Sequence, residues 1–408
     1  MKNKKIVLCV SGGIAAYKSI ELLRLLKKAG AEVQVLGTKN SLRFIPKDVM
    51  SYLSGREALF DEFDNDDFSI IPHIEYAQNW DAIILAPASA NVISKFHNNI
   101  ADDLVTSTLI ASNKPIFIAP AMNCTMYDNL SVSFGDRHFS RIGDMFDGNT
   151  YSYKNFTYIK PKRAMLACGY EGEGALQDPE LIFEIVRRSF IKKDLKKQHF
   201  VVTAGSCREY IDPVRYITNP STGKMGLALA EEIADRGGIV EFVAGNMDKS
   251  IIPVWKFKSV IHTVSAEDMY KAVDFYHTNQ DKTLIMSAAV ADYTVDMSDN
   301  KVKKKGDITL DLKRTKDILM ETIFMGGYNY RIGFCAETEH VIENAKLKLA
   351  KKNLDFIVAN KVSPDFNPFG NDMNNIKIVF KDSVCNTGKL SKKELATIIV
   401  DRYVEYRG

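Results

Sequence analysis

Residues 201–226 read VVTAGSCREYIDPVRYITNPSTGKMG. The segment starts as an apolar strand that ends at Thr203, continues as a polar loop, and reaches a helical pattern at Met225. The first N–H groups of a helix have no partner within the helix, so a strand, a small-residue loop and a helix start together suit an anion. The segment is not a Walker loop, because Thr218 replaces the first glycine of that motif and Met225 its final Ser or Thr.

Composition limits the classes of protein to consider. At 408 residues and 46% hydrophobic content, two domains with separate cores are expected. The net charge of +3 argues against a general nucleic-acid binder. The six cysteines include no Cys-x-x-Cys pair, which argues against structural zinc and disulfides and favours a reducing compartment, the cytoplasm. No apolar run approaches the roughly 18 residues of a membrane span, so no membrane association is expected.

Both halves alternate apolar strands with amphipathic helices. This order predicts an α/β protein with two Rossmann-like three-layer domains and mainly parallel sheets. In the first half the expected strands are 5–10, 31–37, 81–86 and 115–119, and the expected helices are 15–29, 91–112 and 178–193. In the second half the expected strands are 200–203, 239–244, 283–288, 331–335, 354–359 and 376–381, and the expected helices are 225–236, 266–277, 315–325, 341–352 and 392–406.

The polar run KKDLKKQ at residues 192–198 marks the expected boundary. We therefore expect a first domain at 1–190, a linker at 191–198 and a second domain at 199–408. In such sheets, ligands bind outside the carboxyl ends of the strands, so the loops that follow the strands are the candidate sites.

Four stretches of the first half stand at such strand ends. They are SGGIAAYK (11–18), APASAN (86–91), PAMNCTMY (120–127) and LACGYEGEG (166–174), and His73 stands at the expected start of a further helix. A glycine turn, a single histidine or a loop cysteine is more often structural than chemical. The combination is what makes these stretches informative.

Together these stretches resemble the homo-oligomeric flavin-containing cysteine decarboxylases over nearly all of residues 1–190. In that family the flavin oxidises the substrate's thiol, which makes loss of the neighbouring carboxylate easier. The resemblance implies an FMN cofactor bound by Ser11, Gly12, Gly13, Thr38, Ser89 and Asn91.

The same resemblance implies three catalytic residues in the first half. His73 would be the base near the flavin and the thiol, and Asn123 would hold the substrate's carboxylate. Cys168 would protonate the enethiolate, a step suited to a thiol whose ordinary pKa is near 8.5. The chain departs from the family at Ala175, where Arg is common, and at Tyr127, where Trp is common. These departures concern the substrate flap rather than the chemistry.

The second half closely resembles phosphopantothenate–cysteine ligases over residues 199–405. The matching segments are DPVRYITNPSTGKMG (212–226), SAAVADY (287–293), KVKK (301–304), IGFCAET (332–338) and KNLDFIVAN (352–360). In their bacterial form these ligases attach CMP from CTP to a carboxylate and release pyrophosphate. The amine of cysteine then displaces CMP, and metal-bridged phosphates and fixed cations hold the triphosphate.

The ligase resemblance implies Asn219 and Lys301 as catalytic residues. The implied contacts to CTP and phosphopantothenate are Arg215, Ser287, Ala288, Asp292, Lys301, Thr315, Lys316, Asp317, Ile318, Phe334, Lys348 and Lys352. Asp292 is also the candidate contact to Mg²⁺ that accompanies CTP. The lysines near 301–305 and on the helix at 341–352 could instead be solvated surface charges.

As a whole, the chain resembles the bifunctional phosphopantothenoylcysteine decarboxylase/phosphopantothenate–cysteine ligases of coenzyme A biosynthesis. The resemblance implies trimeric flavin domains and dimeric ligase domains, which together make a dodecamer acting on small molecules. A flavin-binding regulatory protein of the same fold is the main alternative, although it would need no base or acid at His73 and Cys168. A dinucleotide dehydrogenase is disfavoured because no G-x-G-x-x-G follows the first strand.

Overall fold

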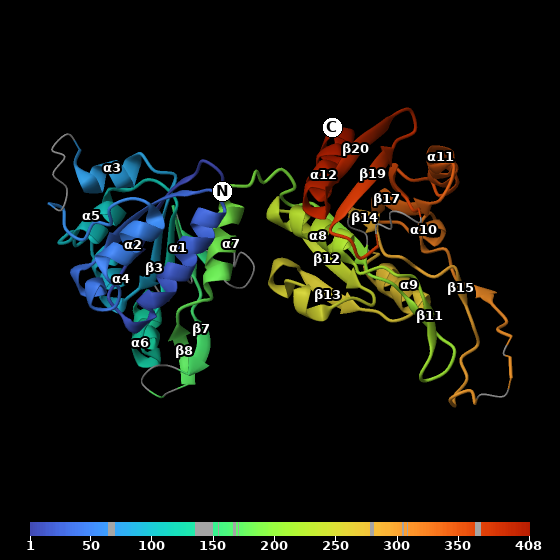
Figure 1. The fold of residues 1–408 in the computed structure, drawn as a ribbon, viewed down its shortest axis with the longest axis horizontal. Helices are drawn as coiled ribbons and strands as arrows, with labels where there is room; N and C mark the ends of the chain where they lie inside the picture. Colours follow the sequence, from blue (N-terminus) through green and yellow to red (C-terminus); the bar gives the residue numbers. More distant parts are fainter. Residues whose placement is uncertain are drawn as a thin grey trace. The chain divides into compact units, whose positions relative to one another are not determined.

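The computed structural model describes residues 1–63, 70–134, 150–153, 155–165, 169, 171–277, 281–303, 306–307, 309–363 and 369–408. The chain divides into two compact units, Met1–Ile191 and Lys192–Gly408 (Figure 1). Each unit contains a mainly parallel sheet covered by helices, so the predicted α/β class is confirmed. Among the described residues, no helix is long and apolar enough to cross a membrane.

The first unit is built on a six-stranded sheet in the order β2-β1-β3-β4-β6-β5, in which β5 alone pairs antiparallel. Its strands are β1 (Lys5–Val10), β2 (Glu32–Gly37), β3 (Ala82–Ala88), β4 (Ile116–Pro120), β5 (Thr150–Tyr153) and β6 (Phe156–Ile159), with a separate hairpin of β7 (Lys162–Met165) and β8 (Glu171–Ala175). Its helices are α1 (Lys18–Lys28), α2 (Lys47–Ser54), α3 (Pro72–Gln78), α4 (Ala90–His97), α5 (Leu104–Ala111), α6 (Cys124–Phe134) and α7 (Pro179–Ser189).

The single helix predicted over 91–112 is wrong. The chain forms two helices there, α4 and α5, because Asn99 adopts a left-handed conformation with φ of 56°. Asp103 then starts α5 with a capping box, in which its carboxylate accepts from the N–H of Thr106 at 2.8 Å. The apolar periodicity continues through the break, so the pattern alone does not reveal it.

The second unit is built on an eight-stranded sheet in the order β13-β12-β9-β14-β17-β18-β19-β20, parallel except for the last two pairings. These strands are β9 (His199–Ala204), β12 (Ile239–Ala244), β13 (Ser259–His262), β14 (Lys282–Met286), β17 (Tyr328–Glu337), β18 (Phe356–Lys361), β19 (Met373–Val379) and β20 (Val384–Ser391). Two small hairpins add β10 (Arg208–Tyr210) with β11 (Tyr216–Thr218), and β15 (Tyr293–Thr294) with β16 (Lys313–Arg314).

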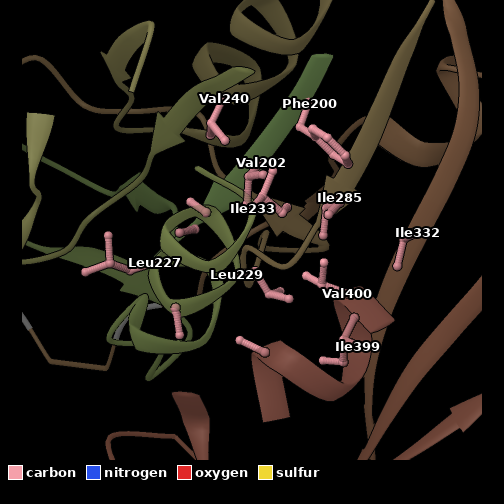
Figure 2. Close-up of a cluster of buried hydrophobic side chains, with 14 of the residues drawn as sticks. Phe200, Val202, Leu227, Leu229, Ile233, Val240, Ile285, Ile332, Ile399 and Val400 are labelled. Atoms are coloured by element: carbon pink, nitrogen blue, oxygen red, sulfur yellow. The ribbon is translucent and has the colours of Figure 1, made fainter. Parts of the chain in front are cut away.

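Helices cover both faces of this sheet. They are α8 (Lys224–Asp235), α9 (Ala266–Phe275), α10 (Ile318–Glu321), α11 (Val341–Lys351) and α12 (Lys392–Arg407). Phe200 and Val202 of β9 pack with α8 and α12 on one face, as Figure 2 shows, whereas Val201 packs with α9, α10 and α11 on the other. The alternation of neighbouring residues along β9 separates the two layers.

One helix predicted for this unit is too long, and the edge strands of its sheet are not predicted. The helix predicted over 315–325 shortens to α10, which Asp317 caps through the N–H of Met320 and which ends at Thr322. The edge strands β13 and β20 and the two small hairpins are not predicted. Edge strands are half-exposed and lack the continuous apolar run that marks the central ones.

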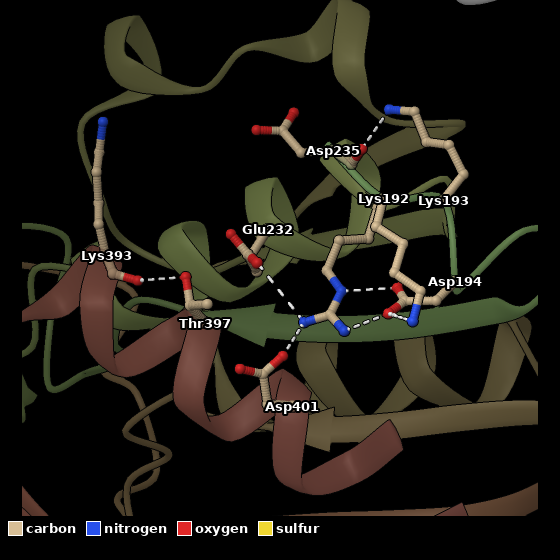
Figure 3. Close-up of polar contacts among 9 residues, drawn as sticks. Lys192, Lys193, Asp194, Glu232, Asp235, Lys393, Thr397 and Asp401 are labelled. Atoms are coloured by element: carbon tan, nitrogen blue, oxygen red, sulfur yellow. Dashed lines mark hydrogen bonds and ion pairs between the residues drawn. The ribbon is translucent and has the colours of Figure 1, made fainter. Parts of the chain in front are cut away.

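The segment expected to be a linker packs on the second unit. Leu195 is fully buried in the core formed by α8 and α12. The guanidinium of Arg236 donates to both carboxylate oxygens of Asp194, at 2.8 and 2.7 Å, and to Asp401 at 2.5 Å (Figure 3). These hydrogen bonds lower the pKa of Asp194, so this pair stabilises the attachment.

Leu195→Ala is therefore expected to destabilise the second unit by about 2–5 kcal/mol, because it leaves a cavity in a packed core. Leu347→Ala provides the control, since Leu347 is 70% exposed and its loss should change stability by about 0.5 kcal/mol or less. Hydrogen-exchange mass spectrometry on the full chain would measure both. Faster exchange confined to peptides of residues 1–190 in Leu195→Ala would contradict the packing described.

Candidate active sites

The loops after β1, β2 and β3 meet at one edge of the first sheet, because these strands run parallel and adjacent. The hydroxyl of Ser11 donates to the carbonyl of Pro87 at 2.8 Å and accepts from the N–H of Ser89 at the same distance. The N–H of Gly12 donates to the hydroxyl of Thr38 at 3.1 Å. Ser11 and Thr38 thus hold three loops together, and Ser11 is itself buried.

The glycine turn is held close to its neighbour. A Cβ on Gly12 would lie 2.6 Å from the Cβ of Asn40, so this position tolerates no side chain without movement. Beside it, no described atom lies within 4 Å of a Cβ built on Gly13. Ser89 caps α4 and Asn91 is exposed in the first turn of that helix. The predicted cofactor-binding residues therefore surround an open backbone turn at a helix start.

His73 lies in the first turn of α3, the helix that precedes β3. Its Nδ1 atom is buried and has no hydrogen-bond partner in the described part of the chain, and Glu62 Oε1 is 3.7 Å away. Asn123 precedes α6, and its side-chain oxygen accepts from the N–H of Thr125 at 2.9 Å. Cys168 lies outside the described residues.

The glycine-rich strand β8 packs against the segment that carries Asn123. The N–H of Met122 donates to the carbonyl of Gly174 at 2.9 Å. A Cβ on Gly174 would lie 2.5 Å from the carbonyl oxygen of Met122, and one on Gly172 would lie 2.7 Å from the Cβ of Cys124. Two motifs about 50 residues apart in the sequence therefore meet, and the glycines permit the close approach.

The second unit contains a cleft of about 800 Å³ at the carboxyl edge of its sheet. Most of the predicted ligase residues line it: Asn219, Ser287, Ala288, Asp292, Thr315, Lys316, Asp317, Ile318, Phe334, Lys348 and Lys352. Arg215 and Lys301 do not line it. Segments that are far apart in the sequence thus form one site.

The contact between α8 and the strand ends shapes this cleft. The hydroxyl of Ser287 donates to the carbonyl of Thr203 at 2.6 Å, and the side-chain amide of Asn219 donates to the carbonyl of Val290 at 3.1 Å. A Cβ on Gly226 would overlap the Ser287 hydroxyl and lie 2.6 Å from the Cβ of Ala204. The last glycine of the STGKMG segment is therefore required by packing.

Lysines from α11 line the cleft with carboxylates beside them. Lys348 donates to Glu337 at 2.5 Å, and Lys352 donates to Asp317 at 2.9 Å. Burial lowers the pKa of Lys348, but the hydrogen bond to Glu337 and the negative charges nearby together outweigh burial and raise that pKa overall. The lysine is therefore charged at neutral pH and able to meet an anionic ligand.

Arg215 has a structural role in the described chain. It donates two hydrogen bonds to the fully buried carboxylate of Asp212, at 2.9 and 2.6 Å, and one to the carbonyl of Val302 at 2.5 Å. Asp212 also accepts from the N–H of Val302 at 3.1 Å. Burial raises the pKa of Asp212, yet these hydrogen bonds, with those from Val214 and the Arg215 backbone, lower it overall. The pair joins the 212–226 loop to the segment that carries Lys301.

The two halves match two family models. Residues 1–191 match the model described as Flavoprotein, and residues 195–406 match the model described as DNA/pantothenate metabolism flavoprotein C-terminal domain. The Coenzyme A biosynthesis bifunctional protein CoaBC of Bacillus subtilis is 43% identical over 387 residues, which cover 94% of this chain and 92% of that protein. The chain belongs to the CoaBC family.

Other members of the CoaBC family match over the same length. The CoaBC protein of Haemophilus influenzae is 37% identical over 409 residues, covering 99% of this chain and 98% of that protein. A crystal structure of the C-terminal domain of a CoaBC protein matches with a TM-score of 0.44 and 35% identity, covering 52% of this chain and 97% of that chain. Both halves of this chain therefore have counterparts in the CoaBC family.

The cleft also contains residues that lie outside the matched motifs. They include Lys351, Asn374 and Lys392. A Ser-x-x-Glu capping box at 391–394 does mark the start of α12 in the sequence, but not that this start reaches the cleft. Cys207 and Cys335 are buried, and burial raises their pKa values to about 12 and about 11, so neither suits a nucleophile.

Asp212→Asn is expected to loosen the 298–303 segment and raise its hydrogen-exchange rate about tenfold or more, because the carboxylate accepts several hydrogen bonds in a buried position. The lowered pKa of Asp212 also means that its stabilising effect is present above about pH 4 and lost below it. The variant should therefore show a weaker acid dependence of stability than the wild type.

Asp296→Asn is the matched control, since that carboxylate is 82% exposed and pairs with Lys313. It should leave exchange at 298–303 and the acid dependence unchanged. Equal behaviour of the two variants would contradict the tether assigned to Asp212.

Proposed function

We propose that the chain catalyses two successive steps of coenzyme A biosynthesis. The second unit joins 4'-phosphopantothenate to cysteine with CTP, and the first unit decarboxylates the product, with FMN, to 4'-phosphopantetheine. Membership of the CoaBC family over both halves supports this function. The observation that carries it is the assembly of the separate ligase motifs around one cleft.

In the ligase half, a carboxylate must first gain a leaving group. Its oxygen attacks the α-phosphorus of CTP, pyrophosphate leaves, and the amine of cysteine then displaces CMP from the acyl carbon. We assign Lys316, Lys348 and Lys352 to the phosphates, because the ligase resemblance implies them as ligand contacts and they line the cleft. We assign Asn219 to the acyl group.

We propose that Mg²⁺ enters with CTP. Among the described residues, no group of three or more His, Cys, Asp or Glu side chains could hold a metal ion. Asp292 lines the cleft and offers one carboxylate, so the phosphates of CTP would supply most of the ligands.

In the decarboxylase half, we propose that Ser11, Gly12, Gly13, Thr38, Ser89 and Asn91 hold FMN. The open backbone at Gly13, beside the start of a helix, supports a phosphate at this turn. When bound, the flavin supplies an electron acceptor for the substrate's thiol. The buried, unsatisfied Nδ1 of His73 supports a base that is completed only when ligand is present.

We propose that the protein is a homo-oligomer, a dodecamer of trimeric flavin domains and dimeric ligase domains. Exposed apolar side chains of the first unit support a contact between copies, since Ile14, Tyr17 and Ile71 are each more than half exposed. The free cysteines among the described residues support the cytoplasm as its compartment.

Mass spectrometry of one reaction tests both activities. Purified protein would be supplied with phosphopantothenate, cysteine, Mg²⁺ and either CTP or ATP. Formation of CMP and phosphopantetheine with CTP is the expected result. Bound flavin with accumulation of the amide would indicate a flavin-binding protein without decarboxylase activity, and no product with either nucleotide would reject the proposed ligation.

Asn219→Asp is expected to abolish amide formation while decarboxylation of added phosphopantothenoylcysteine continues. The new carboxylate would face the carbonyls of Ala289 and Val290, which now accept from the amide, and it would repel an anionic substrate. Separate assays of the two half-reactions would measure this. Unimpaired ligation would exclude the role given to Asn219.

A further inference from the structure

Lys392 is an unusual component of the cleft wall. It is the first residue of α12 and lines the cleft, yet only 8% of the residue is exposed. Lysine is rarely buried to this extent, because its ammonium group loses hydration. None of the ligase motifs above includes it.

A second lysine stands beside it, from another helix. Lys224 is the first residue of α8, and its ammonium group donates to the carboxylate of Asp372 at 2.5 Å. The backbone N–H of Lys392 donates to the carbonyl of the same Asp372 at 3.0 Å. This residue therefore connects the starts of the two helices, which pack on each other.

The two ammonium groups affect each other. Burial lowers the pKa of Lys392, and the charge of Lys224 lowers it further, while Asp372 acts in the opposite direction. Burial and the neighbouring charge thus make the protonated form of Lys392 less stable than that of an exposed lysine. The carboxylate of Asp372 is 81% exposed, so water screens its attraction.

This pair is separate from the lysines already assigned. Lys224 and Lys392 belong to α8 and α12, which cover one face of the sheet. Lys348 and Lys352 come from α11 and the turn that follows it, on the opposite face. The cleft thus has a cationic group on each side of the sheet edge.

We propose that Lys392, together with Lys224, binds a phosphate group of a ligand in this cleft. The inference rests on the proposed ligation and adds a phosphate contact to it. A phosphate dianion matches two adjacent ammonium groups in charge, and lysine binds phosphate as a point charge. The phosphate belongs either to the triphosphate of CTP or to the monoester of phosphopantothenate.

Lys392→Met in the full chain tests the proposal, because it keeps the length of the side chain and removes the charge. Calorimetric titration with CTP and Mg²⁺, and separately with phosphopantothenate, would measure binding without turnover. We expect the variant to bind one of the two ligands about 10- to 100-fold more weakly, the loss typical of one charged hydrogen bond. The ligand affected identifies the source of the phosphate.

Two further variants make the result specific. Lys393→Met removes the exposed lysine next to Lys392 and should bind both ligands as the wild type does. Lys392→Arg keeps the charge and should bind the affected ligand more tightly than Lys392→Met. If Lys392→Met fails to fold, Lys224→Met tests the same contact at a partly exposed position.

The outcomes separate this inference from the proposed function. Wild-type protein that binds neither ligand would reject the ligase assignment itself. Wild-type protein that binds both, with Lys392→Met and Lys224→Met indistinguishable from Lys393→Met, would reject only the phosphate contact.

Discussion

The second unit depends on how closely α8 approaches the carboxyl ends of β9 and β14. The absence of a side chain at Gly226 allows this approach, and the Ser287 hydroxyl and the Ala204 methyl occupy the space that a Cβ would take. The approach places the first turn of α8 in the cleft wall beside Asn219 and Ala288. Residues of α12 pack against those of α8 (Figure 2). The first residue of α12, Lys392, lines the same wall. One missing side chain thus brings several segments of the site together.

The sequence was sufficient to predict the features that this fold shares with many other α/β proteins. Continuous apolar runs predicted the central strands, and their parallel order placed the candidate loops at one edge. The break between α4 and α5 was not predictable, because it depends on the conformation of Asn99 and not on a change in hydrophobicity. The shortening at α10 depends on where the helix is capped, at Asp317 and Thr322, which apolar periodicity does not reveal.

The residues of the cleft that could be predicted are those that belong to the recognised motifs. The motif residues at 287–292, 315–318 and 348–352 contribute to one cleft, as strand ends in a parallel sheet should. Arg215 differs, because its fork geometry fits the buried carboxylate of Asp212 three residues away, a pairing that a residue pattern does not disclose. Lys392 was missed for the opposite reason. A lysine at the first position of a helix is expected to be exposed, and Lys392 is buried only because two helices pack together.

Three lysines of the cleft donate to carboxylates of the chain itself: Lys348 to Glu337, Lys352 to Asp317 and Lys224 to Asp372. An incoming polyphosphate would therefore exchange one anionic partner for another rather than neutralise bare charge. Because the lysine–carboxylate pairs must be broken, the net binding free energy is smaller than the attraction between lysine and phosphate. The same pairs can form again once the phosphate leaves. The site is thereby suited to letting a highly charged leaving group depart, which a wall of unopposed lysines would retain.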